Sequence, residues 1–463
     1  MARLLQSLRR VLGQHPPSSA PRYAGSIDTN FTFFREGDRV VIHGKNPILS
    51  KPLRRGQKSD TRRGQLEHNN IIGRRVRDMV QARKGPEYRL SLPTLEEYVA
   101  LTPRLVTPIY SADANLIVSL LDIHITPPAE AADQAHPHPP PPLEILESGT
   151  GHGSLTLHLA RAIQGANSTA PPIPPSSQVT YLPTKPGEKP TRKLQAPPQN
   201  KTTTPTPTPT PTTTTTPAED PIQQNWDTWR SHRKAIIHSI DITPKSSVHA
   251  ESIVRGFRRG IYAGNVDFSA GHVEDWIAEQ KRQRTRTGGL FPFTKDQDQV
   301  EPFLSYAILD MPSAHVRIPH VASILKRDGI LAVFMPSVTQ IGDCVELIRA
   351  QKLPFVQEKV VELGNGISSG RLWDVRHAVK KARESVSVFS AAEGGEDATA
   401  ATAAAAAAAA AAGEEGEAED AAAPEEAPKE EDSVLVCRPK VGPRIVGGGF
   451  VGIWRKIEEK RQS

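Results

Sequence analysis

The stretch LEILESGTGHGSLTLHLARAI, residues 143–163, decides the fold. A short apolar run at 143–147 reads as a buried strand, and an apolar pattern with helical spacing covers 154–163. Gly149, Gly151 and Gly153 lie between them, where glycine permits positive φ angles and close approach of a ligand to the backbone. Strand, glycine loop and helix in this order are typical of a cofactor loop in an α/β sheet.

The same alternation recurs along the chain. Further strands are expected at 235–241, 266–273, 306–312, 329–337 and 355–363, with helices at 246–259, after 312, and at 340–351. A final pair, 434–439 with 450–456, is expected to add an antiparallel edge. Alternating strands and helices predict an α/β fold, a Rossmann-like parallel sheet covered on both faces. Ligands of such sheets bind at the carboxyl ends of the strands.

Composition narrows the functional classes. Of 463 residues only Cys344 and Cys437 are cysteines, which excludes a disulfide framework and a four-cysteine zinc site, and we expect no metal. No run approaches the roughly 18 apolar residues of a membrane span, so we expect no membrane partner. Residues 391–432 carry thirteen acids and one base, a net charge of −12. Because the whole chain has a net charge of +6, the rest of it carries +18. A body this basic favours a polyanionic partner.

The amino terminus and three low-complexity segments differ from the rest. Residues 1–27 are rich in arginine and lack acids before Asp28, with leucines at helical spacing, which predicts a mitochondrial presequence. An ordinary basic, disordered terminus is the alternative, and the nucleus is the alternative location. Segments 128–142, 165–224 and 386–432 are dominated by proline, by Thr-Pro repeats, and by alanine with acids. Such compositions predict disordered insertions.

The glycine loop departs from the dinucleotide fingerprint. That fingerprint is G-x-G-x-x-G, whereas residues 147–153 read E-x-G-x-G-x-G. Glu147 would repel a pyrophosphate and suits a cationic ligand, such as the sulfonium or ammonium group of S-adenosylmethionine. Asp241 ends the second strand, where a carboxylate can accept hydrogen bonds from ribose hydroxyls. The alternative for Asp241 is a cap on the following turn.

Several motifs occur together in a specific order. They are PLRRGQKSDTRRGQLEHNNIIGRRVRDMV (52–80), YRLSLPTLEEYVALTPRLVTPIYSADANLIV (88–118), ESGTGHGSLTLHLARA (147–162) and YAILDMP (306–312). In these motifs the chain strongly resembles the tRNA (adenine-58-N1)-methyltransferase family. More narrowly, it resembles the catalytic subunit, and the resemblance implies a fungal mitochondrial relative. The resemblance covers most of residues 32–163 and 235–376 and the closing strands. It implies the class I methyltransferase fold.

The resemblance also assigns domains and residues. It implies a small tRNA-binding β-domain at 28–95 and an S-adenosylmethionine-dependent methyltransferase domain at 96–385, closed by strands within 433–463. The cofactor residues that it implies are Tyr110, Glu147, Gly149, Thr150, Gly151, Gly153, Ser154, Asp241, His272, Val273 and Asp310. Family members work as tetramers, either homomeric or with a non-catalytic subunit.

Asp310 is the catalytic residue that the resemblance implies. The family signature D-L-P-x-P-W here reads Asp-Met-Pro-Ser-Ala-His over 310–315, without the second proline and the tryptophan. The adenine must leave its stack to expose N1, as in other base-modifying enzymes. Asp310 would accept a hydrogen bond from the 6-amino group and stabilise the positive charge that develops on the ring.

Basic clusters are expected to hold the RNA backbone, because phosphate contacts supply affinity. Lys58, Arg77, Arg255, Arg258, Arg259 and the run 281–286 belong to them. The densest cluster precedes residue 84, and its candidate RNA-binding residues are Arg54, Arg55, Arg62, Arg63, Arg74 and Arg75.

Two other functions remain open at this point. One is a non-catalytic tRNA-binding subunit with the same fold, which the altered motif after Asp310 allows and the intact glycine loop disfavours. The other is a nicotinamide-dependent oxidoreductase, which the spacing of the glycines and the preceding acid disfavour.

Overall fold

The computed structural model describes residues 25–127, 141–183, 190–192, 220–287, 300–364, 373–379, 433–439 and 448–458. The chain divides into two units, residues 1–369 with 445–463, and residues 370–444. The predicted presequence up to residue 24 and the predicted insertions at 128–140 and 386–432 lie outside the described residues. No described helix has both the length and the apolar composition needed to cross a bilayer.

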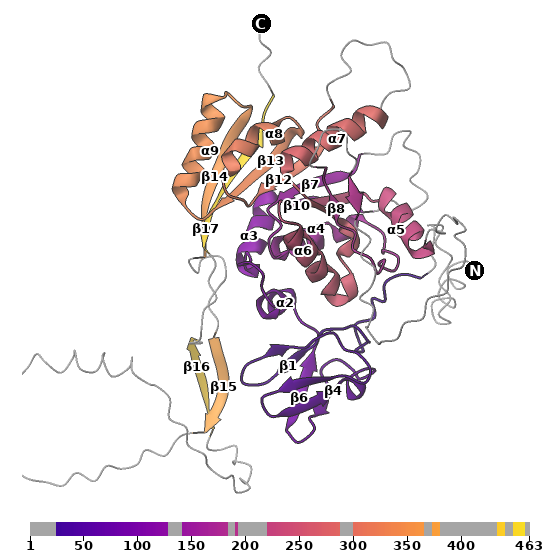
Figure 1. Ribbon diagram of the computed structural model, residues 1–463. Coiled ribbons are helices and arrows are strands. Elements are labelled where there is room, and N and C mark those ends of the chain that lie inside the picture. The colour runs from indigo at the N-terminus through magenta and orange to yellow at the C-terminus, as the bar shows by residue number, and fades with distance from the viewer. Residues whose placement is uncertain are drawn as a thin grey trace, which may run out of the picture. The chain divides into compact units, whose positions relative to one another are not determined.

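A mixed sheet forms the centre of the first unit (Figure 1). The strands β13, β12, β7, β10, β11 and β8 run parallel, whereas β17 is antiparallel to both of its neighbours and lies one place in from the edge strand β14. Across the sheet the order is β14 (Phe355–Leu363), β17 (Gly449–Lys456), β13 (Leu325–Met335), β12 (Leu304–Leu309), β7 (Leu143–Ser148), β10 (Ala235–Asp241), β11 (Val266–Ala270), β8 (Thr180–Tyr181) and β9 (Thr191–Arg192).

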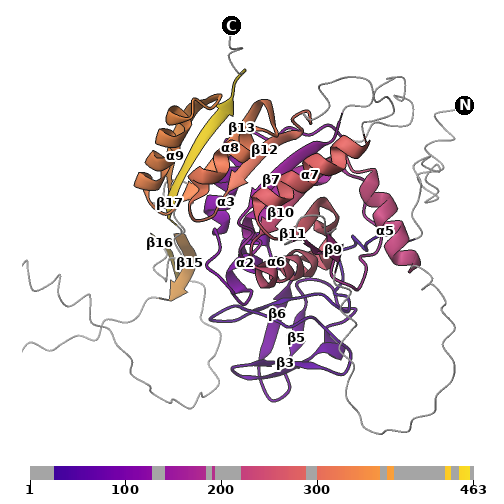
Figure 2. The same ribbon diagram turned by 45° about the horizontal axis from the view of Figure 1, so that its top comes forward.

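Helices cover both faces of this sheet. Successive strand residues point to opposite faces, so Ile145 packs into one hydrophobic core and Leu146 into another. The first core contains residues of α2 (Leu95–Leu101), α3 (Ser111–Leu121), α4 (Ser154–Ile163) and α6 (Pro244–Gly256). The second contains residues of α7 (Val273–Thr287), α8 (Ile318–Ala322) and α9 (Val338–Ala350), and Figure 2 shows α7 and α8 lying over the strands. The predicted α/β class and the Rossmann-like sheet covered on both faces are confirmed.

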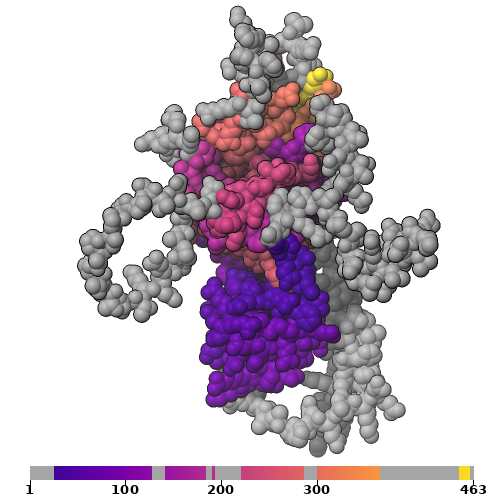
Figure 3. Space-filling view, turned by 90° about the vertical axis from the view of Figure 1, so that its right-hand side faces the viewer, coloured from indigo at the N-terminus to yellow at the C-terminus, as the bar shows by residue number. Residues whose placement is uncertain are grey.

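A small β-domain precedes this sheet, as predicted. Its antiparallel sheet has the order β2 (Ile48–Leu49), β1 (Val41–His43), β6 (Glu87–Ser91) and β5 (Met79–Gln81). A separate hairpin joins β3 (Lys58–Thr61) to β4 (Gly64–Glu67). The domain has its own core, which includes Phe34, Ile42, Leu53, Leu66 and Leu90. It appears as one indigo-to-purple body in Figure 3.

The predicted disordered insertion at 165–224 is wrong at both ends. Residues 165–183 pack on the sheet: β8 pairs with β11, and Val179 and Leu182 are buried. The helix α5 (Pro221–Ser231) begins with an Asp220 cap and buries two tryptophans, Trp226 and Trp229. These apolar residues are too widely spaced to give a periodic signal. Residues 184–189 and 193–219 lie outside the described residues.

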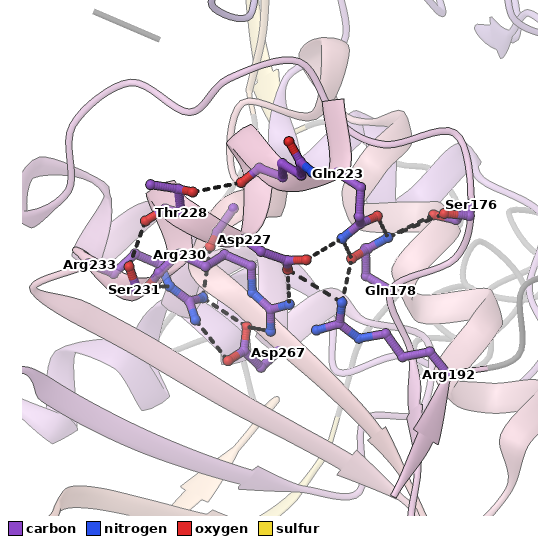
Figure 4. Close-up of polar contacts among 12 residues, drawn as sticks. Ser176, Gln178, Arg192, Gln223, Asp227, Thr228, Arg230, Ser231, Arg233 and Asp267 are labelled. Atoms are coloured by element: carbon purple, nitrogen blue, oxygen red, sulfur yellow. Dashed lines mark hydrogen bonds and ion pairs between the residues drawn. The ribbon is translucent and has the colours of Figure 1, made fainter. Parts of the chain in front are cut away.

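Ion pairs fix α5 and the residues that follow it to β11 (Figure 4). Arg233 donates two hydrogen bonds of 2.8 Å to the carboxylate of Asp267 on β11, and Arg230 lies 2.8 Å from the same carboxylate.

Near the amino terminus, the Ile27 amide donates a hydrogen bond to the Ala170 carbonyl, and the Ile27 side chain is buried. The presequence boundary predicted at residue 27 is therefore too late.

The predicted closing pair, 434–439 with 450–456, is also wrong. The strand β16 (Ser433–Pro439) pairs with β15 (Trp373–Val379) as a separate two-stranded sheet in the second unit. The strand β17 pairs instead with β13 and β14. Both apolar runs read alike in sequence, but β17 supplies Ile453 to one core and Trp454 to the other, which suits an inner strand.

Candidate active site

The carboxyl ends of three neighbouring strands meet at the predicted glycine loop. The amide of Asp310, after β12, donates to the carbonyl of Ser148 at the end of β7 at 2.8 Å. The Gly149 amide donates to the carbonyl of Ile240 on β10, also at 2.8 Å. The loop is therefore tied to the strands on both of its sides.

Glycine is required at the three loop positions for different structural reasons. All have positive φ, +97° at Gly149, +53° at Gly151 and +83° at Gly153. A Cβ on Gly149 would lie 1.8 Å from the Asp310 carbonyl oxygen, and one on Gly153 would lie 3.1 Å from the Cβ of Ala250 on α6. A Cβ on Gly151 would meet Val106 at 3.5 Å and the Gly149 carbonyl oxygen at 4.0 Å, both ordinary contacts. Packing therefore requires the outer two, whereas the backbone conformation requires the middle one.

Glu147 lies beneath the loop. Its side chain is buried and accepts hydrogen bonds from the hydroxyls of Thr156, at 2.6 Å, and Ser239, at 2.7 Å. Burial, together with the nearby carboxylates of Asp310 and Asp241, raises the pKa of Glu147 to about 7. The structure therefore shows Glu147 as a link between β7, β10 and α4, and its predicted contact with a cationic ligand stays a prediction.

Asp241 connects the loop to the second strand. Its carboxylate accepts hydrogen bonds from the amides of Thr243, at 2.8 Å, and Gly151, at 3.1 Å. The capping alternative is thus observed, while a ribose contact stays a prediction. Two further predicted residues also support the loop: Thr150 bonds the Ser239 hydroxyl at 2.8 Å, and Ser154 donates to the Ile109 carbonyl at 2.5 Å.

Asp310 differs from the other two carboxylates. Among the described residues its carboxylate has no hydrogen-bond partner, although it is only partly exposed. Burial and the negative charge of Asp241 together raise the pKa of Asp310 to about 7. A partly desolvated carboxylate with free acceptor positions can bind an amino group or a cation.

The remaining predicted cofactor residues differ in their position and exposure. Tyr110 precedes α3, and its hydroxyl accepts a 2.9 Å hydrogen bond from Arg104. His272 is exposed directly after β11, at the same edge of the sheet. Val273 is 1% exposed and packs in the second core, and its predicted place beside the adenine ring stays a prediction.

A histidine pair, absent from the predicted site residues, also lies at the loop. His152, between two loop glycines, is 2% exposed, and its Nδ1 lies 3.2 Å from the Nε2 of His249 on α6. Burial, together with the charges of His249 and Arg104, lowers the pKa of His152 to about 4. The imidazole is therefore neutral near pH 7. Only tertiary structure brings His249 to the loop, so spacing gave no signal.

The six predicted RNA-binding arginines are exposed on the small β-domain. Arg55 lies 3.8 Å from Glu36, and Arg75 lies over the ring of Phe33. Within the described part of the chain the other four make no ion pair, which leaves Arg54, Arg62, Arg63 and Arg74 able to meet phosphates.

Several basic residues at the end of α6, in the turn after it and on α7 have partners within the fold, and their predicted contact with RNA stays a prediction. Arg259 pairs with Asp38, and Arg255 donates to Glu251 and to the Ser176 carbonyl. On α7, Lys281 donates to Ser323, Arg282 pairs with Glu279, and Arg284 donates to Glu144. Among the described residues no group of three or more His, Cys, Asp or Glu side chains is arranged to hold a metal ion.

Two named relatives resemble the chain in sequence. No family model matches the chain. It is 24% identical over 322 residues, 69% of its length, to the tRNA (adenine(58)-N(1))-methyltransferase TrmI of Thermus thermophilus, of which it covers 81%. It is 26% identical over 133 residues, 28% of its length, to the tRNA (adenine(58)-N(1))-methyltransferase catalytic subunit TRM61 of Candida albicans, of which it covers 35%. The predicted resemblance to this family is confirmed.

A solved structure also aligns with the chain. The crystal structure of tRNA (m1A58) methyltransferase TrmI from Aquifex aeolicus has a TM-score of 0.44 and 13% identity, over 92% of this chain and 100% of that chain.

Proposed function

We propose that this chain is a tRNA (adenine-58-N1)-methyltransferase that uses S-adenosylmethionine as methyl donor. The observation that carries the proposal is the carboxylate of Asp310. It has no hydrogen-bond partner among the described residues, and it lies beside the glycine loop of a methyltransferase fold. The Thermus relative, of which the chain covers 81%, bears the name of this activity.

The residues present fit the cofactor. The loop has three positive-φ glycines, and Gly151 has no neighbour closer than 3.5 Å to a Cβ. The carboxylates of Glu147, Asp241 and Asp310 influence one another electrostatically, so a positive charge bound among them would be stabilised. Gly151 would approach the cofactor backbone to backbone, and Asp241 would exchange its amide partners for ribose hydroxyls. When bound, the cofactor supplies an electrophilic methyl group on a sulfonium.

Asp310 supplies the electrostatic part of the reaction. Its carboxylate would accept a hydrogen bond from the adenine 6-amino group and so hold the Watson–Crick edge in place. Positive charge develops on the ring as N1 forms its new bond, and the carboxylate stabilises that charge. The exposed arginines of the small β-domain, Arg54, Arg62, Arg63 and Arg74, would hold the tRNA backbone.

Single-turnover transfer of labelled methyl to tRNA tests the proposal. Asp310→Ala should reduce transfer at least about 100-fold, the usual scale for one well-placed electrostatic group, and should leave tRNA affinity within a few-fold. Arg74→Ala is the matched contrast: weaker tRNA binding, a shallower salt dependence, and an unchanged rate at saturating protein. Wild-type protein that binds tRNA without transferring methyl would instead support the non-catalytic subunit.

Nothing in the comparisons supports that non-catalytic alternative. The Candida relative is named as the catalytic subunit of its enzyme, so we propose that a partner subunit, or a second copy of this chain, completes the assembly. Light scattering of the purified protein measures this. Mapping 1-methyladenosine in mitochondrial and cytosolic tRNA after deletion of the gene tests our further proposal of a mitochondrial location.

A further inference from the structure

One arginine joins the methyltransferase domain to the small β-domain. Arg259 lies in the turn η4 (Arg258–Gly260), directly after α6. Its Nε and Nη2 each donate a 2.8 Å hydrogen bond to the carboxylate of Asp38 in the small domain. Its remaining N–H groups donate to the carbonyls of Asp28, Asn30 and Phe33 at 3.0–3.1 Å. All five donors of this guanidinium are therefore used across the junction.

The partners of Arg259 are themselves fixed. The Asp38 side chain is 1% exposed, and it also accepts a 2.7 Å hydrogen bond from the Arg35 amide. The ring of Phe31 lies under two guanidiniums, 5.2 Å from that of Arg259 and 5.4 Å from that of Arg258. A planar, bidentate contact of this kind specifies an orientation as well as an affinity.

The turn that carries Arg259 has an unusual backbone. Arg258 and Arg259 both have positive φ, 44° and 58°, in a region that residues with a Cβ rarely adopt. Such conformations persist where the surrounding contacts over-determine them, and they often occur at functional junctions. Here they turn both guanidiniums toward the small domain.

The same helix also supports the cofactor loop. Ala250, in the middle of α6, is the residue against which Gly153 packs. Near the carboxyl end of α6, the Ile253 carbonyl accepts a 2.9 Å hydrogen bond from Tyr98, on the helix that follows the small domain. The helix α6 thus contacts the candidate cofactor loop on one side and leads into the Arg259 junction at its end.

We propose that Arg259 is a positioning residue that holds the small β-domain, and the tRNA bound to it, in register with the methyl-transfer site. This inference rests on the proposed function, because it assigns tRNA to the exposed arginines of that domain. Arg259 does not touch the reacting atoms. Its effect is on where the target adenine arrives relative to Asp310, and a small misplacement of a substrate is costly to the rate.

Arg259→Lys is the informative variant, because lysine keeps the charge but loses the five-donor fork. Arg455→Lys is the matched control. Arg455 lies on β17 and pairs with Glu358 and Asp328, away from both the junction and the site. Hydrogen exchange of residues 28–38 reports the junction without any activity. We expect faster exchange there in Arg259→Lys only.

Kinetics then separate positioning from stability. In Arg259→Lys we expect single-turnover methylation of whole tRNA to fall about 10- to 100-fold, with S-adenosylmethionine affinity within about twofold. The methylation rate of an isolated T-arm hairpin should fall less, because so short an RNA depends less on contacts with the small β-domain. Asp38→Asn should behave like Arg259→Lys, and the double variant should be no worse than the poorer single one, because both remove one interaction.

Equal tRNA kinetics in Arg259→Lys and Arg455→Lys, or the same loss on hairpin and whole tRNA, would overturn the positioning role. Wild-type protein that transfers no methyl group would refute the proposed function instead. In that case the hydroxyl-radical footprint on bound tRNA decides: an altered footprint in Arg259→Lys supports positioning, and an unchanged one rejects it.

Discussion

Gly149 and Asp310 touch through their backbones: a Cβ on Gly149 would lie 1.8 Å from the Asp310 carbonyl oxygen. The Asp310 amide also donates to Ser148, the residue before Gly149. The start of the glycine loop and the candidate catalytic aspartate are therefore one packed unit. A displacement of either must displace the other.

Exchanging two loop glycines for alanine separates packing from conformation. Gly149→Ala forces the Asp310 backbone to move, so we expect a loss of unfolding free energy of at least about 3 kcal/mol. Gly151→Ala meets no close atom and suffers only its positive φ of +53°, at a cost of about 1–2 kcal/mol. Urea denaturation measures both values.

The affinity for S-adenosylmethionine is a second measurement on the same variants. A folded Gly151→Ala protein should bind S-adenosylmethionine at least about tenfold more weakly, because a methyl group enters the space that glycine leaves for a ligand. Titration calorimetry measures this. Wild-type affinity in that variant would remove Gly151 from the cofactor site, and equal stability of the two variants would contradict the packing argument.

The ion pairs under α5 predict a large effect from a single aspartate (Figure 4). Asp267→Ala leaves the guanidiniums of Arg230 and Arg233 without their shared partner, and their side chains are 16% and 4% exposed. We expect a loss of about 3–5 kcal/mol in unfolding free energy. The control Asp227→Ala removes a carboxylate that is 47% exposed and pairs with Arg230 at 3.6 Å. It should cost about 0–1 kcal/mol, and similar losses in both would contradict the argument.

The Thr-Pro segment should be dispensable where its flanks are not. Replacement of residues 193–219 by a glycine–serine segment of equal length should leave the melting temperature within about 2 °C, since its composition cannot build a core. Deletion of 168–222 removes β8 and the buried Ala170, Val179 and Leu182, and should lower it by at least about 5 °C. Thermal unfolding followed by circular dichroism compares the two. A destabilised replacement variant would mean that the repeat packs on the fold.

Features that depend on local sequence were predicted correctly, whereas features that depend on tertiary contacts were not. The strand at 355–363 and the helix starting at Ser154 were predicted at the observed bounds, because apolar periodicity and glycine are local signals. The partner of β16 was not, because two similar apolar runs leave pairing to tertiary structure. Arg259 looked like a phosphate ligand for the same reason: a basic run reads as solvated until Asp38 is found beside it.

Glu147→Gln tests the cost of a buried carboxylate. Burial raises the pKa of Glu147 from 4.5 to about 7, so its neutral form stabilises the fold below pH 4.5 and that contribution is lost as the pH rises through about 7. The full difference is about 3 kcal/mol. Glutamine can still accept from Thr156 and Ser239. We therefore expect the melting temperature of Glu147→Gln to fall less between pH 6 and pH 9 than that of the wild type.

Only part of that decline should disappear, because Asp310 has a raised pKa of the same kind. Asp227→Ala is a suitable reference, since its side chain is 47% exposed. Parallel curves for Glu147→Gln and wild type across pH 6–9 would show that Glu147 is ionised in the folded protein at all of these values.

The pH dependence of methyl transfer tests Asp310 directly. Burial and the charge of Asp241 raise its pKa to about 7, and only the ionised form can accept from the 6-amino group while it stabilises the developing positive charge. The value of kcat/KM reports groups of the free enzyme, so it should rise about tenfold per pH unit below 7 and level off above. Asp310→Asn should be slow at every pH, without that rise. Glu147→Gln should keep the wild-type profile, which assigns the titration to Asp310. A wild-type profile that is flat from pH 5.5 to 8.5, or a rise that survives in Asp310→Asn, would exclude Asp310 as the group that must ionise.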